Sequence, residues 1–266
     1  MHLSNKNFIL HPHPSGKITC KVAVLENDDK YFVKYLRTYD NEFHTAEEIF
    51  NEVLEERILA ALDISDLNHS VEPVNSRIAI VQRYYAKNWS NVASEGLEIA
   101  NFDEWPLFLT AETWVRQTDR GPGKNEHVGL AVVDGVGSKY RAGPLDLGCS
   151  FVGQPGGYEG VDDDLTSDWV KSLFWTKQDF PKAALEEAIA KIEKLSIVQI
   201  VNSAMEHILQ ASNWSEEVKV HIKKHGDRVA NFLYARRAKL KEVLLGWWDQ
   251  AHAGVVETPA AQVAAV

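Results

Sequence analysis

The sequence predicts an α+β fold of two lobes, a small N-terminal lobe with strands and one helix, and a mostly helical C-terminal lobe. Strand-like and helix-like patterns are mixed in the first part of the chain, whereas the segment from Pro181 to Gln250 has a helical period and no further proline. Strand–helix units do not recur, which excludes a doubly wound parallel sheet. We expect an N-lobe over residues 1–86, a C-lobe over residues 87–252 and a flexible tail over residues 253–266.

Four segments define the N-lobe. The β-branched run Ile18–Leu25 and the run Tyr31–Leu36 predict an antiparallel hairpin. Apolar residues recur with a helical period in the following segment, Thr45–Leu62, and the threonine can cap this helix. Arg77–Gln82 predicts another strand, so the expected order is β-β-α-β, preceded by a solvated N-terminus around His11.

The C-lobe begins with a buried helix and a hairpin. Large apolar residues predict a helix within Phe102–Arg116, starting near Pro106, and the Gly-Pro-Gly at 121–123 prevents its continuation. Val128–Val133 predicts a strand, and Asp134-Gly135 is a hairpin turn signal. The second strand of this hairpin should end near residues 145–147.

The composition narrows the classes of partner. The 266 residues include 38 acidic and 28 basic side chains, a formal charge of −10, which argues against nucleic acid as a partner. Two cysteines cannot form a disulfide framework. No apolar run approaches the roughly 18 residues of a spanning helix, and none has the form of a signal peptide. We therefore expect a cytoplasmic protein that does not enter a membrane.

One lysine interrupts an apolar strand. Lys34 stands between Val33 and Tyr35, so its side chain either faces water or meets an anionic partner. The next helix offers acidic partners, but its period does not choose among them. The four candidates are Glu48, Glu52, Glu55 and Glu56.

Three oxygen-bearing residues could converge from two loops. Asp119 and Asn125 share one loop, and Asp146 follows the hairpin. Such side chains suit a hard divalent cation such as Mg²⁺, and a further carboxylate can accept a proton from a hydroxyl nucleophile. Alternatively, Asp119 and Asn125 only shape a Gly-Pro turn. The order lysine, helix acid, hinge, Asp–Asn loop, hairpin, Asp is that of a protein-kinase-like phosphotransferase.

Four segments of the chain share a pattern with a known family. They are Asn51–Leu62 (NEVLEERILAAL), Trp114–Asn125 (WVRQTDRGPGKN), Pro144–Phe151 (PLDLGCSF) and Phe232–Leu244 (FLYARRAKLKEVL). Together, and in this order, they resemble the HipA-like kinase family, and the similarity extends over roughly residues 15–250. The loop arrangement is also similar to that of phosphoinositide kinases.

The resemblance implies a bilobal protein-kinase-like fold that binds ATP and Mg²⁺ in the cleft between the lobes. It implies transfer of the γ-phosphoryl group to a hydroxyl, with a protein serine or threonine as the expected acceptor. The implied roles are phosphate binding by Lys34, orientation of that lysine by Glu52, general base catalysis by Asp119, metal ligation by Asn125 and Asp146, adenine contact at Gln82 or Arg83, and phosphate cover by Ser15 and Gly16.

This chain departs from the family pattern at several positions. Gln117 replaces the first Asn of the catalytic loop, and Leu147 replaces a common His. Asn125 lies one residue further from Asp119 than kinases usually have it, and no glycine-rich loop precedes the first strand. The open alternatives are a pseudokinase that binds nucleotide or protein, and a kinase of lipids or small molecules. We interpret Arg236-Arg237 as a charged helix face or a phosphate contact.

Overall fold

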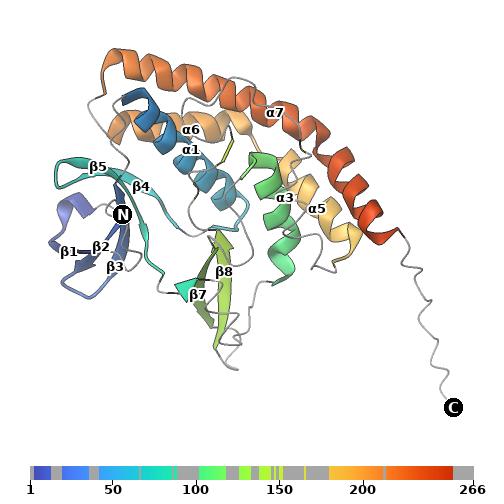
Figure 1. Cartoon of the computed structure of the whole chain (residues 1–266), viewed down its shortest axis with the longest axis horizontal. Helices are drawn as coiled ribbons and strands as arrows, with labels where there is room; N and C mark the ends of the chain where they lie inside the picture. Colours follow the sequence, from blue (N-terminus) through green and yellow to red (C-terminus); the bar gives the residue numbers. More distant parts are fainter. Residues whose placement is uncertain are drawn as a thin grey trace.

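The computed structural model describes residues 3–12, 20–35, 42–65, 67–85, 87–88, 102–117, 126–132, 138–144, 147, 150–151, 165, 180–211 and 214–253. These residues form the bilobal α+β architecture that the sequence predicts, with a β-rich N-terminal part and a mostly helical C-terminal part (Figure 1).

The N-terminal lobe contains a five-stranded antiparallel sheet with strand order β1-β2-β3-β5-β4. Its strands are β1 (Phe8–Pro12), β2 (Cys20–Leu25), β3 (Lys30–Tyr35), β4 (Ser70–Val74) and β5 (Arg77–Arg83). Alternate residues of a strand face opposite sides of a sheet. Val33 and Val81 therefore join a small core on one face, whereas Ile80 joins the main core on the other face.

The four predicted elements are confirmed as β2, β3, α1 and β5, but the predicted β-β-α-β order is incomplete, because it omits β1 and β4. These two strands are the edges of the sheet, where the sequence pattern is weakest. β1 is largely exposed, with Ile9 67% exposed, and the segment around His11 is a strand instead of a solvated terminus. β4 contains Pro73, a residue that sheets accept at edges and at few other positions.

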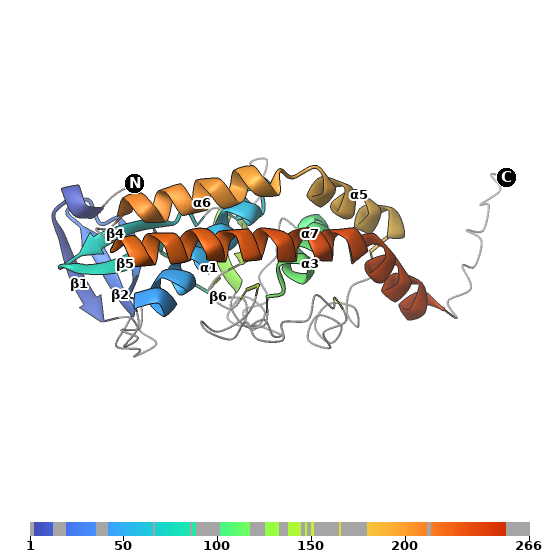
Figure 2. The ribbon, with the colours of Figure 1, turned by 90° about the horizontal axis from the view of Figure 1, so that it is seen from above.

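Helix α1 (Glu42–Ala61) covers the face of the sheet that carries Ile80. It begins at Glu42 and not at the expected cap Thr45. Its other sides pack against α6 (Ile197–Ala211) and α7 (Glu216–His252). Figure 2 shows α6 and α7 running side by side along the molecule, and α6 also contacts β4, where the N–H of Val71 donates to Nε2 of His207.

The C-terminal lobe combines α3 (Trp105–Val115), which follows a short 3₁₀ turn, with α5 (Lys182–Glu193), α6 and α7. A second sheet has strand order β6-β7-β8 and contains β6 (Lys87–Asn88), β7 (Glu126–Val132) and β8 (Ser138–Pro144). The antiparallel pairing of β7 with β8 confirms the predicted hairpin, although its turn lies outside the described residues. None of the described helices has the length and apolar content to cross a bilayer.

Candidate active site

Lys34 and Glu52 form an ion pair between the sheet and α1. Lys34 is opposite Ile80 in the register of β3 and β5, so its side chain lies on the face that α1 covers. Its Nζ donates to Oε2 of Glu52 at 2.7 Å. The Glu52 side chain is 1% exposed and that of Lys34 is 18% exposed. A buried carboxylate is costly without a cation, so Lys34 stabilises Glu52. Part of the Lys34 side chain remains accessible.

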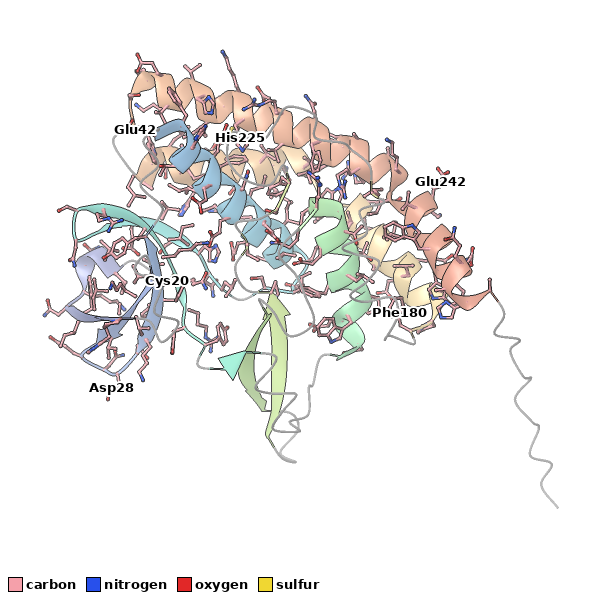
Figure 3. All side chains as sticks on the ribbon, viewed as in Figure 1. Cys20, Asp28, Glu42, Phe180, His225 and Glu242 are labelled. Carbon is pink, nitrogen blue, oxygen red and sulfur yellow. The ribbon has the colours of Figure 1, made fainter. Side chains whose placement is uncertain are left out.

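The N-terminal half of α1 is bound to α7 through a buried polar cluster. Oε1 of Glu47 lies 2.7 Å from Nε2 of His221 and accepts from Arg228 at 3.4 Å. Nε2 of His225 lies 2.9 Å from Oδ1 of Asn51, and Figure 3 places His225 where α7 faces α1. Burial lowers the pKa of His225 to about 3, with Arg228 and His221 acting in the same direction. The cluster fixes α1 on the side away from Lys34.

The end of α3 is shaped by a left-handed residue. Arg116 has φ 57°, its N–H donates to the carbonyl of Thr113, and the N–H of Gln117 donates to the carbonyl of Glu112 at 3.0 Å. This is the hydrogen-bond pattern of a Schellman motif. It ends the helix and directs the chain into the segment that carries the predicted catalytic loop.

A buried arginine on α7 satisfies the last carbonyls of α3. Arg236 is 0% exposed, and it donates to the carbonyl oxygens of Trp114 at 2.9 Å and Thr113 at 2.6 Å. Trp114 donates from its indole to the carbonyl of Leu233 at 2.9 Å. A helix C-terminus carries unpaired carbonyls and partial negative charge, so the guanidinium suits this position. The interpretation of Arg236 as part of a solvated face or a phosphate contact is wrong.

The neighbouring Arg237 has the same function at another helix. It donates to the carbonyl of Leu195 at 2.8 Å, just beyond the end of α5. The two adjacent arginines thus hold the C-terminal ends of two different helices against α7.

The segment after position 146 packs on the same end of α3. The N–H of Phe151 donates to the carbonyl of Val115 at 2.6 Å, and Ser150 Oγ donates to the carbonyl of Leu147. Leu147 and Phe151 are both fully buried. The chain just before the predicted catalytic loop, at Gln117, and the chain just after Asp146, at Leu147 and Phe151, therefore meet at one helix end.

The end of β5 is the predicted adenine hinge. Gln82 is 3% exposed, and its Oε1 lies 2.5 Å from Nε2 of His69. The N–H of Arg83 donates to the carbonyl of Leu67 at 3.0 Å, and its guanidinium lies 5.4 Å from the ring centroid of Tyr85. The Gln82 side chain thus holds β5 against the segment that leads into β4.

His69 makes the fold sensitive to acid. Burial lowers its pKa to about 4, although Glu56 and the bond with Gln82 act in the opposite direction. Because this folded pKa lies below the unfolded value of about 6.5, the unfolded chain binds more protons between these limits. The unfolding free energy keeps the full contribution of His69 above about pH 6.5. It falls from there towards pH 4, by up to about 1.4 kcal/mol per pH unit for this residue.

We expect His69→Gln to flatten this dependence, because the amide can donate to Gln82 without titrating. Urea denaturation of both proteins between pH 7 and pH 5 measures the effect. His11→Gln, on the exposed edge strand β1, is the matched control and should keep the wild-type slope. An unchanged slope in His69→Gln would contradict the assignment.

The other predicted site residues lie outside the described residues. These are Asp119, Asn125, Asp146, Ser15 and Gly16. Among the described residues, no cluster of three or more His, Cys, Asp or Glu side chains could hold a metal ion.

Sequence reasoning missed the structural roles of Gln117, His69 and Arg236. In the sequence, Gln117 stands out only as a departure from the family pattern, and no sequence signal indicates its partner. Arg236 carries a usable signal, because it falls on the apolar stripe of α7 marked by Leu233 and Leu240. We find no sequence signal that would have singled out His69.

The bilobal α+β fold is kinase-like, as comparison with solved structures shows. The chain is similar to the crystal structure of a Helicobacter pylori proinflammatory kinase, CtkA, with a TM-score of 0.50 and 14% sequence identity. The match covers 89% of this chain and 98% of that chain. No protein-family model and no curated protein matches the chain. At this identity the likeness is one of fold.

Proposed function

We propose that this chain is an ATP- and Mg²⁺-dependent kinase of the HipA-like group that phosphorylates a protein serine or threonine. Nucleotide would bind between the N-lobe (1–86) and the C-lobe (87–252). The observation that carries the proposal is the ion pair of Lys34 with the buried Glu52, which holds an ammonium group on the sheet face beside α1. Phosphotransferases of this fold use such a lysine to hold the α- and β-phosphates.

The proposed reaction assigns one role to each residue. Lys34 binds phosphate oxygens, and Glu52 orients Lys34. Asp119 accepts the proton of the acceptor hydroxyl as its oxygen bonds to the γ-phosphorus, and the bond from that phosphorus to the β–γ bridging oxygen breaks to release ADP. Mg²⁺, when bound, neutralises charge on the phosphate oxygens. Carboxylate and amide oxygens suit this ion, so Asp146 and Asn125 are its proposed ligands.

The end of α3 supports this arrangement. Gln117 precedes Asp119 by two residues, and Leu147 directly follows Asp146. The hydrogen bonds of Gln117 and Phe151 at this helix end hold the two chain segments together. Gln82 and Arg83, at the end of β5, are the proposed adenine contacts, and Ser15 with Gly16 the proposed cover of the phosphates.

The test combines nucleotide binding with turnover. We expect Mg-ADP to raise the melting temperature of the full chain, and radiolabelled ATP to transfer phosphate to the chain itself or to casein. Asp119→Asn and Asp146→Asn should each reduce transfer about 100-fold or more while the protein stays folded.

The outcomes separate the alternatives. Stabilisation by Mg-ADP without phosphate transfer would indicate a pseudokinase. The extra residue between Asp119 and Asn125 favours this alternative. Transfer to phosphatidylinositol or to a small alcohol, but not to protein, would indicate a kinase of lipids or small molecules. Full transfer in both Asp variants would refute the assigned site.

A further inference from the structure

Gln117 makes a side-chain contact that crosses from the C-terminal lobe to α1. Its Nε2 donates to both carboxylate oxygens of Glu55, at 3.2 and 3.1 Å, across 62 residues of sequence. Gln117 is 3% exposed and Glu55 is 0% exposed. The contact is therefore a bidentate hydrogen bond within the core and not a surface encounter.

Glu55 lies one helical turn after Glu52. Residues three apart in a helix share a face, so the same stretch of α1 holds Lys34 of β3 through Glu52 and Gln117 through Glu55. The helix between the two acids is hydrogen-bonded and rigid. A shift of α1 away from Gln117 would therefore also move the partner of Lys34.

The Gln117 end of the contact is fixed independently. Its backbone N–H donates to the carbonyl of Glu112, and Arg236 holds the carbonyls of Thr113 and Trp114 just before it. The side-chain contact with Glu55 is thus a link between a fixed helix end and α1. A carboxylate that is fully buried costs more than an apolar pair of similar volume, so stability alone gives little reason for this choice of residues.

We propose that Glu55 and Gln117 are a positioning pair that sets the Lys34–Glu52 ion pair relative to the loop beginning after Gln117, which carries Asp119. The proposal rests on the kinase function proposed above. Neither side chain contacts substrate in this role. Both act through their neighbours, by holding α1, with its Lys34–Glu52 ion pair, against the end of α3.

A series that exchanges the amide and the carboxylate tests the pair. Gln117→Glu sets two carboxylates against each other and should lower kcat about 10- to 100-fold, while the affinity for Mg-ADP changes less than about threefold, because Lys34 and Glu52 remain. Adding Glu55→Gln restores a donor and an acceptor in exchanged positions, and should recover most of kcat. Gln210→Glu, on an exposed position of α6, is the matched control and should leave kcat unchanged.

The result that overturns the proposal is a wild-type kcat in Gln117→Glu, or an exchanged pair that is folded and no more active than Gln117→Glu. If Gln117→Glu does not fold, Gln117→Met keeps the side-chain length without the donor, and a wild-type kcat there overturns the proposal equally. A purely structural role would make kcat and Mg-ADP affinity fall together with the melting temperature. Absence of turnover in the wild-type chain would refute the kinase function itself, which distinguishes the two failures.

Discussion

Lys34→Met is expected to lower the rate of phosphoryl transfer by about two to three orders of magnitude, because a single preorganised positive group at a developing charge contributes on this scale. Methionine retains the length and apolar character of the side chain but removes the ammonium that lies 2.7 Å from Glu52. Initial rates with radiolabelled ATP at saturating Mg²⁺ measure the loss. Lys34→Arg should not restore the rate, since a planar guanidinium cannot replace a compact ammonium at this position.

The same substitution should also affect stability. It leaves the Glu52 carboxylate buried without its cation, which costs about 3 kcal/mol of unfolding free energy on the scale of broken buried pairs. Lys34→Met combined with Glu52→Met removes both charges and should recover most of this loss in urea denaturation. The double variant should remain inactive. If it regains turnover, Lys34 has only a structural role and its assignment to phosphate is wrong.

The choice of Glu52 shows what a helical period can and cannot predict. The lysine was singled out because it interrupts an apolar strand, and this signal is local. Its partner depends on where α1 crosses the sheet, which is a property of tertiary packing. The acids at 52 and 55 both lie buried on α1, yet one meets β3 and the other meets Gln117. Among the features of the sequence, only the motif resemblance selects Glu52.

The strands also differ in how well their own sequence predicts them. β2, β3 and β5 are interior strands of the sheet and carry the β-branched, apolar patterns that predict strands. β1 and β4 each need only one sheet neighbour, so β1 carries an exposed Ile9 and β4 carries a proline, which an edge strand accepts. The lobes could therefore be predicted from the sequence, while the sheet edges could not.

Arg236 illustrates a signal that sequence reasoning could have used. Val229, Leu233, Leu240 and Leu244 are buried on one face of α7, and Arg236 falls within that stripe. A cation at such a position must find partners in the core. Its partners include backbone carbonyls of α3. Every residue has such a carbonyl, so no pattern in the α3 sequence indicates them.

Arg236→Met is expected to be the most destabilising single substitution on α7. It leaves the carbonyls of Trp114 and Thr113 buried without their guanidinium donor, and two buried hydrogen bonds from a charged group are lost together. We expect a loss of about 4 kcal/mol in unfolding free energy, which corresponds to a drop of roughly 10 °C in melting temperature for a chain of this size. Differential scanning calorimetry measures the change.

Lys241→Met provides the matched control, because the same type of change at an exposed position of the same helix should shift stability by less than about 0.5 kcal/mol. The loss of stability in Arg236→Lys should lie between those of Arg236→Met and Lys241→Met, since one ammonium cannot donate in the two directions of the guanidinium. The end of α3 leads into the loop that carries Asp119, so Arg236→Met should also lower kcat at temperatures where the variant is fully folded. A melting temperature within 2 °C of wild type would mean that other groups satisfy these carbonyls, and that α7 does not hold the loop in place.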